Sequence, residues 1–504
     1  MMYDVHAPRV LIVGGGLVGL SAALFLQHQG VDAVLVERRR TTSPQPKARR
    51  INLRTMELFR QLGITDIVLA AATDLAGYQA MAAGPTLAQA QQLPFTLPGG
   101  VPQWDTITPA TSCLCAQDEL EPTLRRVARE RGCDVRFAVE CTEFAEDATG
   151  IEATLRAADG TVERIRVDYL IAADGAASPI RQRLGIPRSG RGSLGRAVNV
   201  YFRADLRNLV RGREFNLCQI DNDAVPGAFV SVDGAFRWIF STADGVDRPF
   251  DRWPRALRTA IGRSDLPLEV LSVLPWEPGM FVADRYRSGR VFLAGDAAHV
   301  MPPYAAAGAN TGIQDAHNLA WKLAHVLRGA AGPALLDSYH AERHPIGWYV
   351  ADQSSVRTAD LRAMNTTSTD GTPLADPIAL ILGVRYPAGA LIGDASAHTM
   401  DHLDVGGQPG TRVPHRFLPD GRSTLDLMGT GFALLTGPAG LPWRARDTSV
   451  EVFEMDRAWC AAAGLTDSGA LLVRPDQIVA WRSPTLPPDP VAALRTALDR
   501  ILCA

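Results

Sequence analysis

The stretch Val10-Leu-Ile-Val-Gly-Gly-Gly-Leu-Val-Gly19 decides the fold that we expect for this chain. It begins with a short apolar run of the kind found in a buried strand and continues into closely spaced glycines. A helical pattern over residues 17–29 follows, and a second apolar run covers residues 33–37. Strand, helix and strand in this order predict a βαβ unit at the N-terminus.

The glycines of this unit spell Gly-x-Gly-x-x-Gly, the pattern of a dinucleotide-binding loop. Gly14 permits the tight turn, Gly16 lets the backbone approach a pyrophosphate, and Gly19 lets the helix pack against the strand. The N-terminus of that helix offers free N–H groups to phosphate oxygens. Glu37, at the end of the second apolar run, is placed to accept hydrogen bonds from ribose hydroxyls.

A second literal match, Gly190-Arg-Gly-Ser-Leu-Gly195, lacks this context. It follows Pro187 and Arg188 rather than a strand pattern, and a β-branched and aromatic run follows it instead of a helix. We therefore expect a loop there, and one dinucleotide fold in the chain rather than two. A nicotinamide donor would then dock without a domain of its own.

The composition is that of a globular protein with several domains. The chain has 504 residues, of which 46% are hydrophobic and 21% charged, and its net charge is -3. This balance leaves no basic excess for nucleic-acid binding. The uncharged segment 10–29 is interrupted by glycines and lacks the basic flank of a signal peptide, so we expect no membrane partner.

The seven cysteines show no disulfide framework. Cys113 and Cys115 are two residues apart, which is not the spacing of a redox or zinc pair. Cys460 and Cys503 are far apart in sequence, so we expect no thiol redox chemistry from the C-terminal region. Reduced thiols indicate a cytoplasmic location.

A further cluster, His340-x-Glu342-x-His344, has no evident third ligand, so we expect no metal site there. We expect residues 337–343 to form a capped and solvated helix. The sequence contains neither the G-x-S-x-G elbow of serine hydrolases nor a W-x-W-x-I-P motif, whose absence counts against a flavin-dependent halogenase.

Periodicity gives a coarse map of the remaining elements. Helices are predicted over 55–62, 118–131 and 313–327, and strands over 135–144 and 291–294. A strand-rich stretch is expected over 197–273, and the central strands of a small α/β domain at 432–435 and 470–473. Residues 75–110 are expected to form an excursion from the first domain, and residues 366–388 a linker.

Four further segments, in order and spacing, resemble motifs of the single-component (class A) FAD-dependent aromatic hydroxylases. They are Pro46-Lys-Ala-Arg49 leading into Arg54-Thr-Met-Glu57, Gln117-Asp-Glu-Leu-Glu121, Ala173-Asp-Gly-x-x-Ser-x-x-Arg181 and Gly295-Asp-Ala-Ala-His299. Downstream, residues 410–436 resemble the C-terminal extension of the phenol hydroxylase-like branch. Within the family, the chain looks most similar to hydroxylases of aromatic polyketides such as anthracyclines and tetracenomycins, which implies a place in antibiotic biosynthesis.

The resemblance implies an α/β fold with three parts: a glutathione-reductase-like FAD-binding Rossmann domain, an inserted β-sheet substrate domain and a C-terminal thioredoxin-like α/β domain. We expect the FAD-binding domain to comprise residues 1–76, 112–190 and 276–365, the substrate-binding domain 77–111 and 191–275, and the thioredoxin-like domain 393–504.

The resemblance also implies contacts to FAD. Asp296 would hydrogen-bond a ribityl hydroxyl, and the helix led by Asn310 would point its N-terminus at the flavin edge that becomes anionic on reduction. Arg49 and Gln117 would contact the flavin or its phosphates, and the backbone at Cys141 would meet the adenine. The full set of candidate cofactor residues is Gly14, Gly16, Leu17, Val18, Gly19, Glu37, Arg38, Arg49, Gln117, Cys141, Asp174, Asp296, Pro303, Gly308, Ala309 and Asn310. Candidates for substrate contact are Tyr78, Arg203, Asn216, Gln219 and Trp238.

One segment departs from the family pattern, which usually has a Gly-Gly-x-Gly loop after paired prolines. Here Pro302-Pro303 is followed by Tyr304-Ala-Ala-Ala-Gly-Ala-Asn310. Alanine disfavours the positive φ angles that glycine adopts freely. The departure leaves open the shape of a loop expected beside the reactive carbon of the flavin.

The family reaction implies that NADPH or NADH reduces FAD and that dioxygen adds at flavin carbon 4a. An electron-rich carbon, ortho or para to a phenol, then attacks the distal oxygen of the resulting flavin hydroperoxide. Ionising a phenol of pKa ~10 at pH 7 costs roughly 4 kcal/mol, so the site needs a base or hydrogen-bond donors, to which we assign no residue. Two alternatives stay open at this point: Baeyer–Villiger insertion beside a ketone, and binding of flavin or an aromatic ligand without turnover. Whether the chain forms a homo-oligomer is also open.

Overall fold

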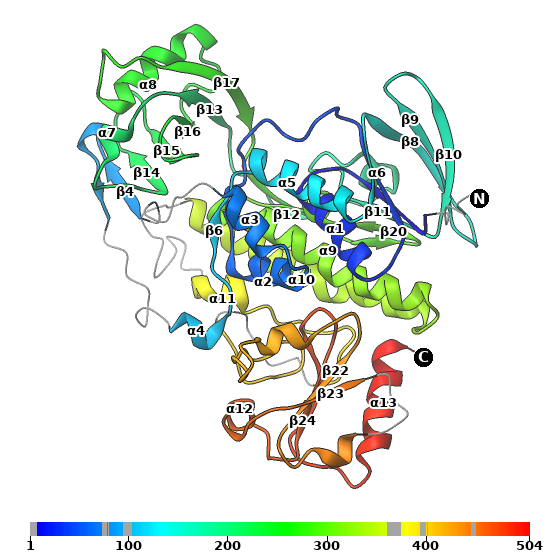
Figure 1. Cartoon of the computed structure of the whole chain (residues 1–504). Helices are drawn as coiled ribbons and strands as arrows, with labels where there is room; N and C mark the ends of the chain where they lie inside the picture. The colour runs from blue at the N-terminus through cyan, green and yellow to red at the C-terminus, as the bar shows by residue number, and fades with distance from the viewer. Residues whose placement is uncertain are drawn as a thin grey trace.

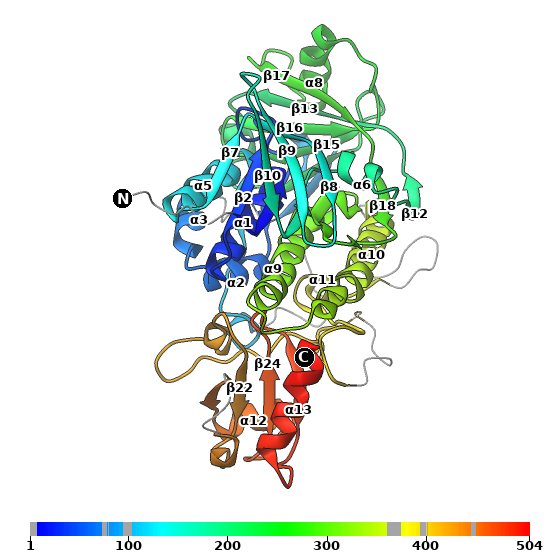
Figure 2. The ribbon, with the colours of Figure 1, turned by 90° about the vertical axis from the view of Figure 1, so that its right-hand side faces the viewer.

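The computed structural model describes residues 8–72, 78, 80–93, 103–359, 374–393, 400, 402–444 and 450–503. Figure 1 shows a central body built around one sheet, a second sheet above it, and a small C-terminal domain below. Figure 2, turned by a quarter, shows the same three parts stacked along the long axis of the molecule.

The central sheet confirms the predicted Rossmann topology. Its strand order is β19-β20-β11-β1-β2-β7, and all neighbours except β19 are parallel. Because parallel strands end at the same edge, the segments that follow them meet there. The strands are β1 (Val10–Val13), β2 (Ala33–Glu37), β7 (Asp134–Phe137), β11 (Tyr169–Ala172), β19 (Arg287–Ser288) and β20 (Val291–Leu293).

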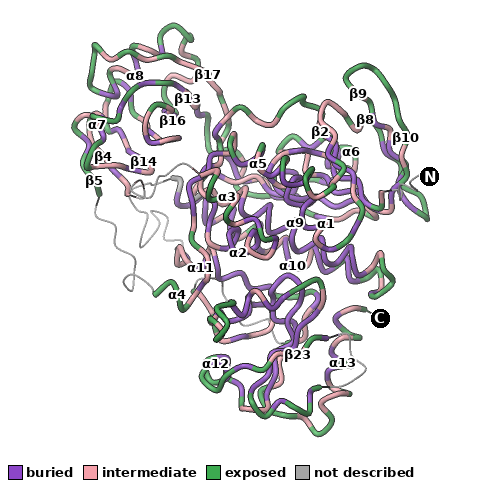
Figure 3. The backbone as a smooth tube through the Cα atoms, in the orientation of Figure 1, coloured by how far each residue is buried: buried purple, intermediate pink, exposed green. Residues whose placement is uncertain are grey.

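Helix α1 (Leu17–His28) is apolar around most of its circumference because it is covered on several sides, packing against β1 and two further helices. Its approach to the strand depends on Gly19, where a Cβ atom would lie 1.9 Å from the carbonyl oxygen of Gly14. The other helices of the central body are α2 (Leu53–Gln61), α3 (Thr65–Ala71), α5 (Gln117–Glu130), α6 (Pro179–Arg183), α9 (Ala307–Leu327) and α10 (Ser338–Ala359). Figure 3 shows the buried centre that these elements share.

The strand predicted over 135–144 is wrong as a single element. Ala138 adopts φ +61° and donates its N–H to the carbonyl of Arg39 at 2.9 Å, which separates β7 from the next strand. β7 therefore stays in the parallel sheet, while the chain continues into an antiparallel meander of β8 (Val139–Glu146), β9 (Ile151–Ala157) and β10 (Val162–Val167).

The second sheet confirms the strand-rich stretch expected over 197–273. Its order is β17-β13-β16-β15-β14-β4-β5, and the last two strands come from the excursion before residue 110. Helix α8 (Trp253–Ile261) and the short α7 (Arg207–Val210) cover one face and enclose a separate core. The strands are β4 (Met81–Gly84), β5 (Gln91–Gln92), β13 (Ala197–Arg203), β14 (Leu217–Ile220), β15 (Gly227–Ser231), β16 (Arg237–Thr242) and β17 (Glu269–Trp276), and the excursion also contains α4 (Trp104–Ile107).

The loop expected at the second Gly-x-Gly-x-x-Gly match is wrong for residues 190–193, which belong to a strand. Strand β12 (Arg188–Ser193) pairs antiparallel with β18 (Gly279–Ala283), and a bulge interrupts its register. A Cβ at Gly190 would lie 2.4 Å from the carbonyl oxygen of Met280, so glycine allows the two strands to approach. β18 also pairs with β21 (His299–Val300), and the remaining short pair is β3 (Arg50–Ile51) with β6 (Cys113–Leu114).

The C-terminal sheet has the strand order β23-β22-β24-β25, with one parallel pair and two antiparallel pairs. This is the arrangement of the expected thioredoxin-like domain. Its elements are β22 (Ala433–Thr436), β23 (Glu451–Glu454), α12 (Arg457–Ala462), β24 (Ala470–Val473), β25 (Val479–Ser483) and α13 (Pro490–Leu502). Cys460 is buried in its core, whereas Cys503 is exposed after α13.

The expected linker is only partly a linker. Residues 366–373 lie outside the described residues, but the part that is described contains α11 (Pro377–Leu382). The carbonyl and the N–H of Ala375, just before α11, are held by Arg357 and Gln353 of α10. Within the described ranges, no helix is long and apolar enough to cross a membrane.

The expected solvated helix over 337–343 is contradicted at its C-terminal end, where Glu342 has no exposed surface. Its carboxylate accepts hydrogen bonds from Lys322 of α9 at 2.8 Å and from both terminal nitrogens of Arg474 at 2.8 Å. Arg474 also pairs with Asp476, and all four charges are buried. Lys322 and Arg474 are 20 and 132 residues away from Glu342 in sequence, so no local pattern predicts these pairs.

Replacement of Glu342 tests this buried network. Glu342→Gln leaves Lys322 without its paired carboxylate and Arg474 with Asp476 alone, so we expect a loss of about 3 kcal/mol of stability. Thermal and urea denaturation of the holoenzyme measure it. Asp337→Asn is the control, because Asp337 is 75% exposed in its pair with Arg287 and its removal should cost less than about 1 kcal/mol. Equal effects of the two substitutions would contradict the assignment.

A buried histidine makes stability depend on pH. Burial lowers the pKa of His317 to about 3, and its ring Nε2 donates a hydrogen bond to the side-chain oxygen of Gln61 at 2.7 Å. The unfolded chain takes up a proton near pH 6.5 and the folded protein does not, so stability falls as pH falls below that value. From pH 7.5 to pH 5 the loss should be about 2 kcal/mol from this group. His317→Gln should lose less Tm over the same interval, with excess FAD present, and an identical loss would contradict this origin.

Candidate active-site cavity

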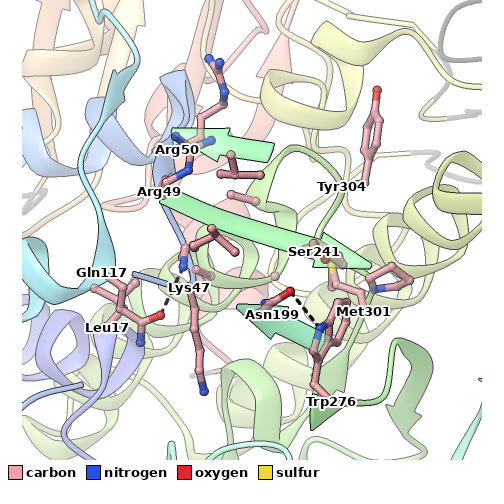
Figure 4. A pocket seen from close by; sticks show the side chains of 18 of the residues that line it. Leu17, Lys47, Arg49, Arg50, Gln117, Asn199, Ser241, Trp276, Met301 and Tyr304 are labelled. Atoms are coloured by element: carbon pink, nitrogen blue, oxygen red, sulfur yellow. Dashed lines mark hydrogen bonds between the residues drawn. The ribbon is translucent and has the colours of Figure 1, made fainter. Parts of the chain in front are cut away.

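A cavity of about 2230 Å³ lies between the carboxyl edge of the central sheet and the open face of the second sheet. Small-molecule pockets are usually ~300–1,000 Å³, so this cavity has room for a dinucleotide and a second ligand. Figure 4 shows part of its lining, with Leu17, Lys47 and Gln117 on one side and Asn199, Trp276 and Met301 on the other.

The turn after β1 forms one end of the cavity. Gly14 has φ +115°, and Gly16 precedes α1 without any side-chain cap, so the first N–H groups of the helix face the cavity. The Glu37 carboxylate accepts the N–H of Gly15 at 2.8 Å and the N–H of Arg39 at 2.9 Å. This arrangement offers backbone donors to a pyrophosphate and a carboxylate to ribose hydroxyls.

Two aspartates follow the next strands along the same edge. Asp174 accepts the N–H of Ile180 at 3.2 Å through one oxygen, while its other oxygen is buried without a partner among the described residues. Asp296 is exposed only because it projects into the cavity, and its depth in the molecule raises its pKa. Both carboxylates are acceptors suited to hydroxyl groups of a ligand.

The turn that carries Asp296 is fixed from behind by Asp315 of α9. Asp315 accepts hydrogen bonds from the N–H of Gly295 at 3.1 Å, from His299 at 2.7 Å and from Arg343 at 2.7 Å. Burial alone would raise the pKa of Asp315, but His299 and Arg343 hold it below its usual value. Asp315 and Arg343 were absent from the sequence-based candidates because their partners come from other elements.

The segment before β3 joins the two sheets. The guanidinium of Arg49 donates to the carbonyl of Ser231 and to Asn216, whose side-chain oxygen is 2.6 Å away. Burial lowers the pKa of Arg49 to about 9. The side-chain oxygen of Gln117 accepts the N–H of Ala48 at 3.4 Å. The guanidinium of Arg49 and the amide of Gln117 therefore both hold this segment in the cavity wall.

The alanine-rich loop takes the shape that glycine normally provides. Ala306 adopts φ +54° and ψ 32°, a left-handed conformation that costs an L-residue roughly 1–2 kcal/mol. Asn310 holds the loop, because its amide donates to the carbonyls of Ala306 at 2.8 Å and Arg50 at 2.9 Å and accepts the N–H of Asn52 at 3.0 Å. Helix α9 begins at Ala307, earlier than expected.

The second sheet contributes two rows of side chains in register. Asn199, Ser241, Ala228 and Gln219 are cross-strand partners and line the cavity as a mainly polar row. A second, apolar row lies on the same face, because its members are two positions away from those of the polar row on each strand. This row consists of Tyr201, Ile239, Val230 and Leu217. Trp276 donates to Asn199 at 3.1 Å and so fixes the end of the polar row (Figure 4).

Apolar residues close another side. Pro377, Ile378 and Ile381 of α11 line the cavity together with Met301 and Tyr304. The sequence pattern suggested a linker at this helix because the helix is short and flanked by turn-forming residues. Its contribution could only be seen once the chain was folded back onto the cavity.

Most of the candidate cofactor residues meet at this cavity. Those that line it are Gly14, Gly16, Leu17, Val18, Glu37, Arg38, Arg49, Gln117, Asp174, Asp296, Pro303, Gly308 and Ala309. Gly19 instead packs on Gly14, and Asn310 holds the loop from behind. Cys141 lies in β8 and is not among the lining residues.

The candidate substrate residues separate into two groups. Asn216 and Gln219 line the cavity. Tyr78 donates its hydroxyl to the carbonyl of Gly234 at 2.6 Å, and Arg203 is exposed beside Glu269. Trp238 is fully buried in the core of the second sheet. The last three therefore lie outside the cavity lining.

Lining residues that sequence analysis did not single out include Ser43, Lys47, Glu121, Asn199 and Trp276. Lys47 and Glu121 belong to motifs already quoted, which was the available signal. Asn199 and Trp276 had none, because only strand pairing brings them together. In the described part of the chain, no three His, Cys, Asp or Glu side chains are grouped as metal ligands.

Asp296 gives the site its sharpest test. Asp296→Ala removes a charged acceptor from the cavity, so FAD affinity should fall by roughly 1.5–3 kcal/mol. Asp296→Asn keeps an acceptor and should lose less. Titration of the apoprotein with FAD measures both, with Asp284→Ala as a control because Asp284 is exposed and does not line the cavity. Unchanged FAD affinity in Asp296→Ala would refute the role.

Comparison with known families agrees with this geometry. Residues 8–354 match the family described as FAD binding domain, and residues 406–504 match the family described as aromatic-ring hydroxylase, C-terminal. The first match covers more than half of the chain and contains every motif at the carboxyl edge.

Individual relatives are similar over their whole length. The chain is 43% identical to tetracenomycin B2 monooxygenase-dioxygenase of Streptomyces olivaceus, over 98% of each protein. It is 42% identical to tetracenomycin A2 monooxygenase-dioxygenase of Streptomyces glaucescens, over 98% of this chain and 96% of the relative. Its fold superposes on aklavinone-11 hydroxylase, solved with FAD and aklavinone, with a TM-score of 0.91 and 32% identity over 100% of both chains. The chain therefore belongs to the FAD-dependent aromatic-ring hydroxylases.

Proposed function

We propose that this enzyme hydroxylates a polycyclic aromatic polyketide at a ring carbon beside a phenol, using NADPH or NADH and dioxygen. The observation that carries the proposal is the cavity of about 2230 Å³, which joins the carboxyl edge of the central sheet to a sheet face with polar and apolar rows. Tetracenomycin and aklavinone hydroxylases, to which the chain is similar, are named for polyketide substrates.

The residues of the cavity fit FAD. We infer that Glu37 and Arg38 hold the adenosine end and that the N-terminus of α1 holds the pyrophosphate. Asp296 would accept a hydrogen bond from the ribityl chain, and Gly308 and Ala309 would contact the ring system. The free oxygen of Asp174 and the uncapped N–H groups after Gly16 support this placement. When bound, FAD would accept a hydride from the nicotinamide and activate dioxygen.

The chain itself orients the substrate and excludes water. Met301, Tyr304 and α11 give the cavity an apolar side, which limits water around the reacting ring. Arg49 holds a positive charge at the junction of the two sheets, where the phenol approaches the cofactor. A cation there favours the ionised phenol, whose ring is more electron-rich.

We also propose the domain limits expected from sequence: residues 1–76, 112–190 and 276–365 for FAD, 77–111 and 191–275 for substrate, and 393–504 for the C-terminal domain. The excursion supports them, since β4 and β5 complete the second sheet. A cytoplasmic setting is supported by seven cysteines that form no disulfide in the structure.

Anaerobic stopped-flow reduction tests the function. Aklavinone or a tetracenomycin-type naphthacenequinone should accelerate reduction of the bound flavin by NADPH or NADH at least about tenfold, as a productive complex forms. The aerobic product should carry one added oxygen, and NMR should place it as a ring hydroxyl rather than in a lactone. A reduction rate that no polycyclic phenol changes, with no oxygenated product, would contradict the proposal.

A further inference from the structure

Charge is unevenly distributed around the cavity. The Lys and Arg residues that line it all fall between residues 38 and 50: Arg38, Arg39, Lys47, Arg49 and Arg50. Among the described residues that the second sheet contributes to the lining there is no cation, and the charged ones are Asp221 and Asp223. Positive charge thus gathers on the cofactor side, and the substrate side is neutral or negative.

Strand β14 sets the order of these groups. Asn216, immediately before the strand, binds Arg49. Leu217 belongs to the apolar row, Gln219 to the polar row, and Asp221 follows the end of the strand. At ~3.3 Å per residue, Asp221 lies roughly 17 Å beyond Asn216. A ligand that extends along β14 from Arg49 therefore passes apolar, then neutral polar, then acidic surroundings.

The acidic end is defined by the turn between β14 and β15. Asp221 and Asp223 are exposed and line the cavity, and Gln219 donates its amide to Asp221 at 2.9 Å. The polar row beside them consists of amides and a hydroxyl from Asn199, Ser241 and Gln219. These groups bind neutral hydroxyl and carbonyl groups, and the carboxylates accept hydrogen bonds but repel anions.

We propose that the substrate is uncharged at its distal end: a polycyclic phenol or quinone that carries hydroxyl donors there and whose carboxyl group is absent or esterified. The proposal rests on the proposed function and adds a restriction on the substrate. A carboxylate within ~6 Å of one like charge at this partly exposed site binds roughly three- to tenfold more weakly than a neutral group.

A matched pair of ligands tests the restriction. The probes are 4,5-dihydroxyanthraquinone-2-carboxylic acid and its methyl ester, titrated into the holoenzyme and followed through the absorbance of the bound flavin. The ester should bind at least about tenfold more tightly than the acid at low ionic strength. Because exposed charges are screened by salt, the ratio should shrink at about 0.5 M NaCl.

Variants locate the effect. Asp221→Asn with Asp223→Asn removes both acidic charges, so it should improve binding of the acid relative to the ester by about tenfold or more. The control pair Asp251→Asn with Asp265→Asn removes the same charge from exposed positions of the same domain that do not line the cavity, and should leave the ratio unchanged.

The outcomes separate the two proposals. Equal binding of acid and ester, or a ratio that Asp221→Asn with Asp223→Asn leaves unchanged, overturns the restriction while the proposed function stands. If the ester and aklavinone both fail to bind, to accelerate flavin reduction and to gain oxygen, the proposed function falls and the restriction falls with it. A larger ester preference that responds to salt and to these carboxylates supports both.

Discussion

Two buried carboxylates on neighbouring helices, Asp315 of α9 and Glu342 of α10, hold the molecule together at its centre. Asp315 fixes the turn that carries Asp296, and Glu342 receives Arg474 from the C-terminal domain. A charge without exposed surface is tolerated only when partners neutralise it, so each carboxylate dictates where those partners lie. Buried hydrogen bonds and ion pairs thereby connect the turn of Asp296, the helices α9 and α10, and the C-terminal domain.

The cavity divides its chemistry between two sheets of different origin. The parallel sheet supplies glycines and carboxylates at its carboxyl edge, which is where this topology brings distant segments together. The antiparallel sheet presents alternating rows because side chains two residues apart share a face. The cavity therefore has a wall of glycines and carboxylates from the central sheet and a wall of polar and apolar side chains from the second sheet and α11. Arg49 spans the boundary and keeps the two sheets in register.

The loop after Pro302-Pro303 shows how a local rule can be overridden. Alanine is disfavoured at φ +54°, yet Ala306 is held there by the amide of Asn310, which also binds Arg50 and Asn52. Three backbone contacts from one side chain outweigh a strain of roughly 1–2 kcal/mol. Alanine in place of glycine thus still adopts the left-handed conformation at position 306.

The sequence by itself determined the βαβ unit, the glycine turn, and the positions of Glu37, Asp174 and Asp296. These features depend on neighbours a few residues away, where steric and hydrogen-bonding requirements leave few residue types. The cofactor and the class of reaction followed from the same motifs. The central strands of the C-terminal domain were also predictable, because β22 and β24 are continuous apolar runs buried on both faces.

Only the tertiary structure decided which polar residues are buried and which face the cavity. Trp238 is an aromatic residue of the kind that stacks on ligands, but it is buried in the core of the second sheet. Asn199 and Trp276 instead reach the cavity because strand pairing brings them together. Glu342 looks solvated in a charged sequence and is buried because Lys322 and Arg474 arrive from elsewhere. Periodicity reports which residues share a face of one element. It does not report which element packs on that face, and burial, charge pairing and access to the cavity all depend on that packing.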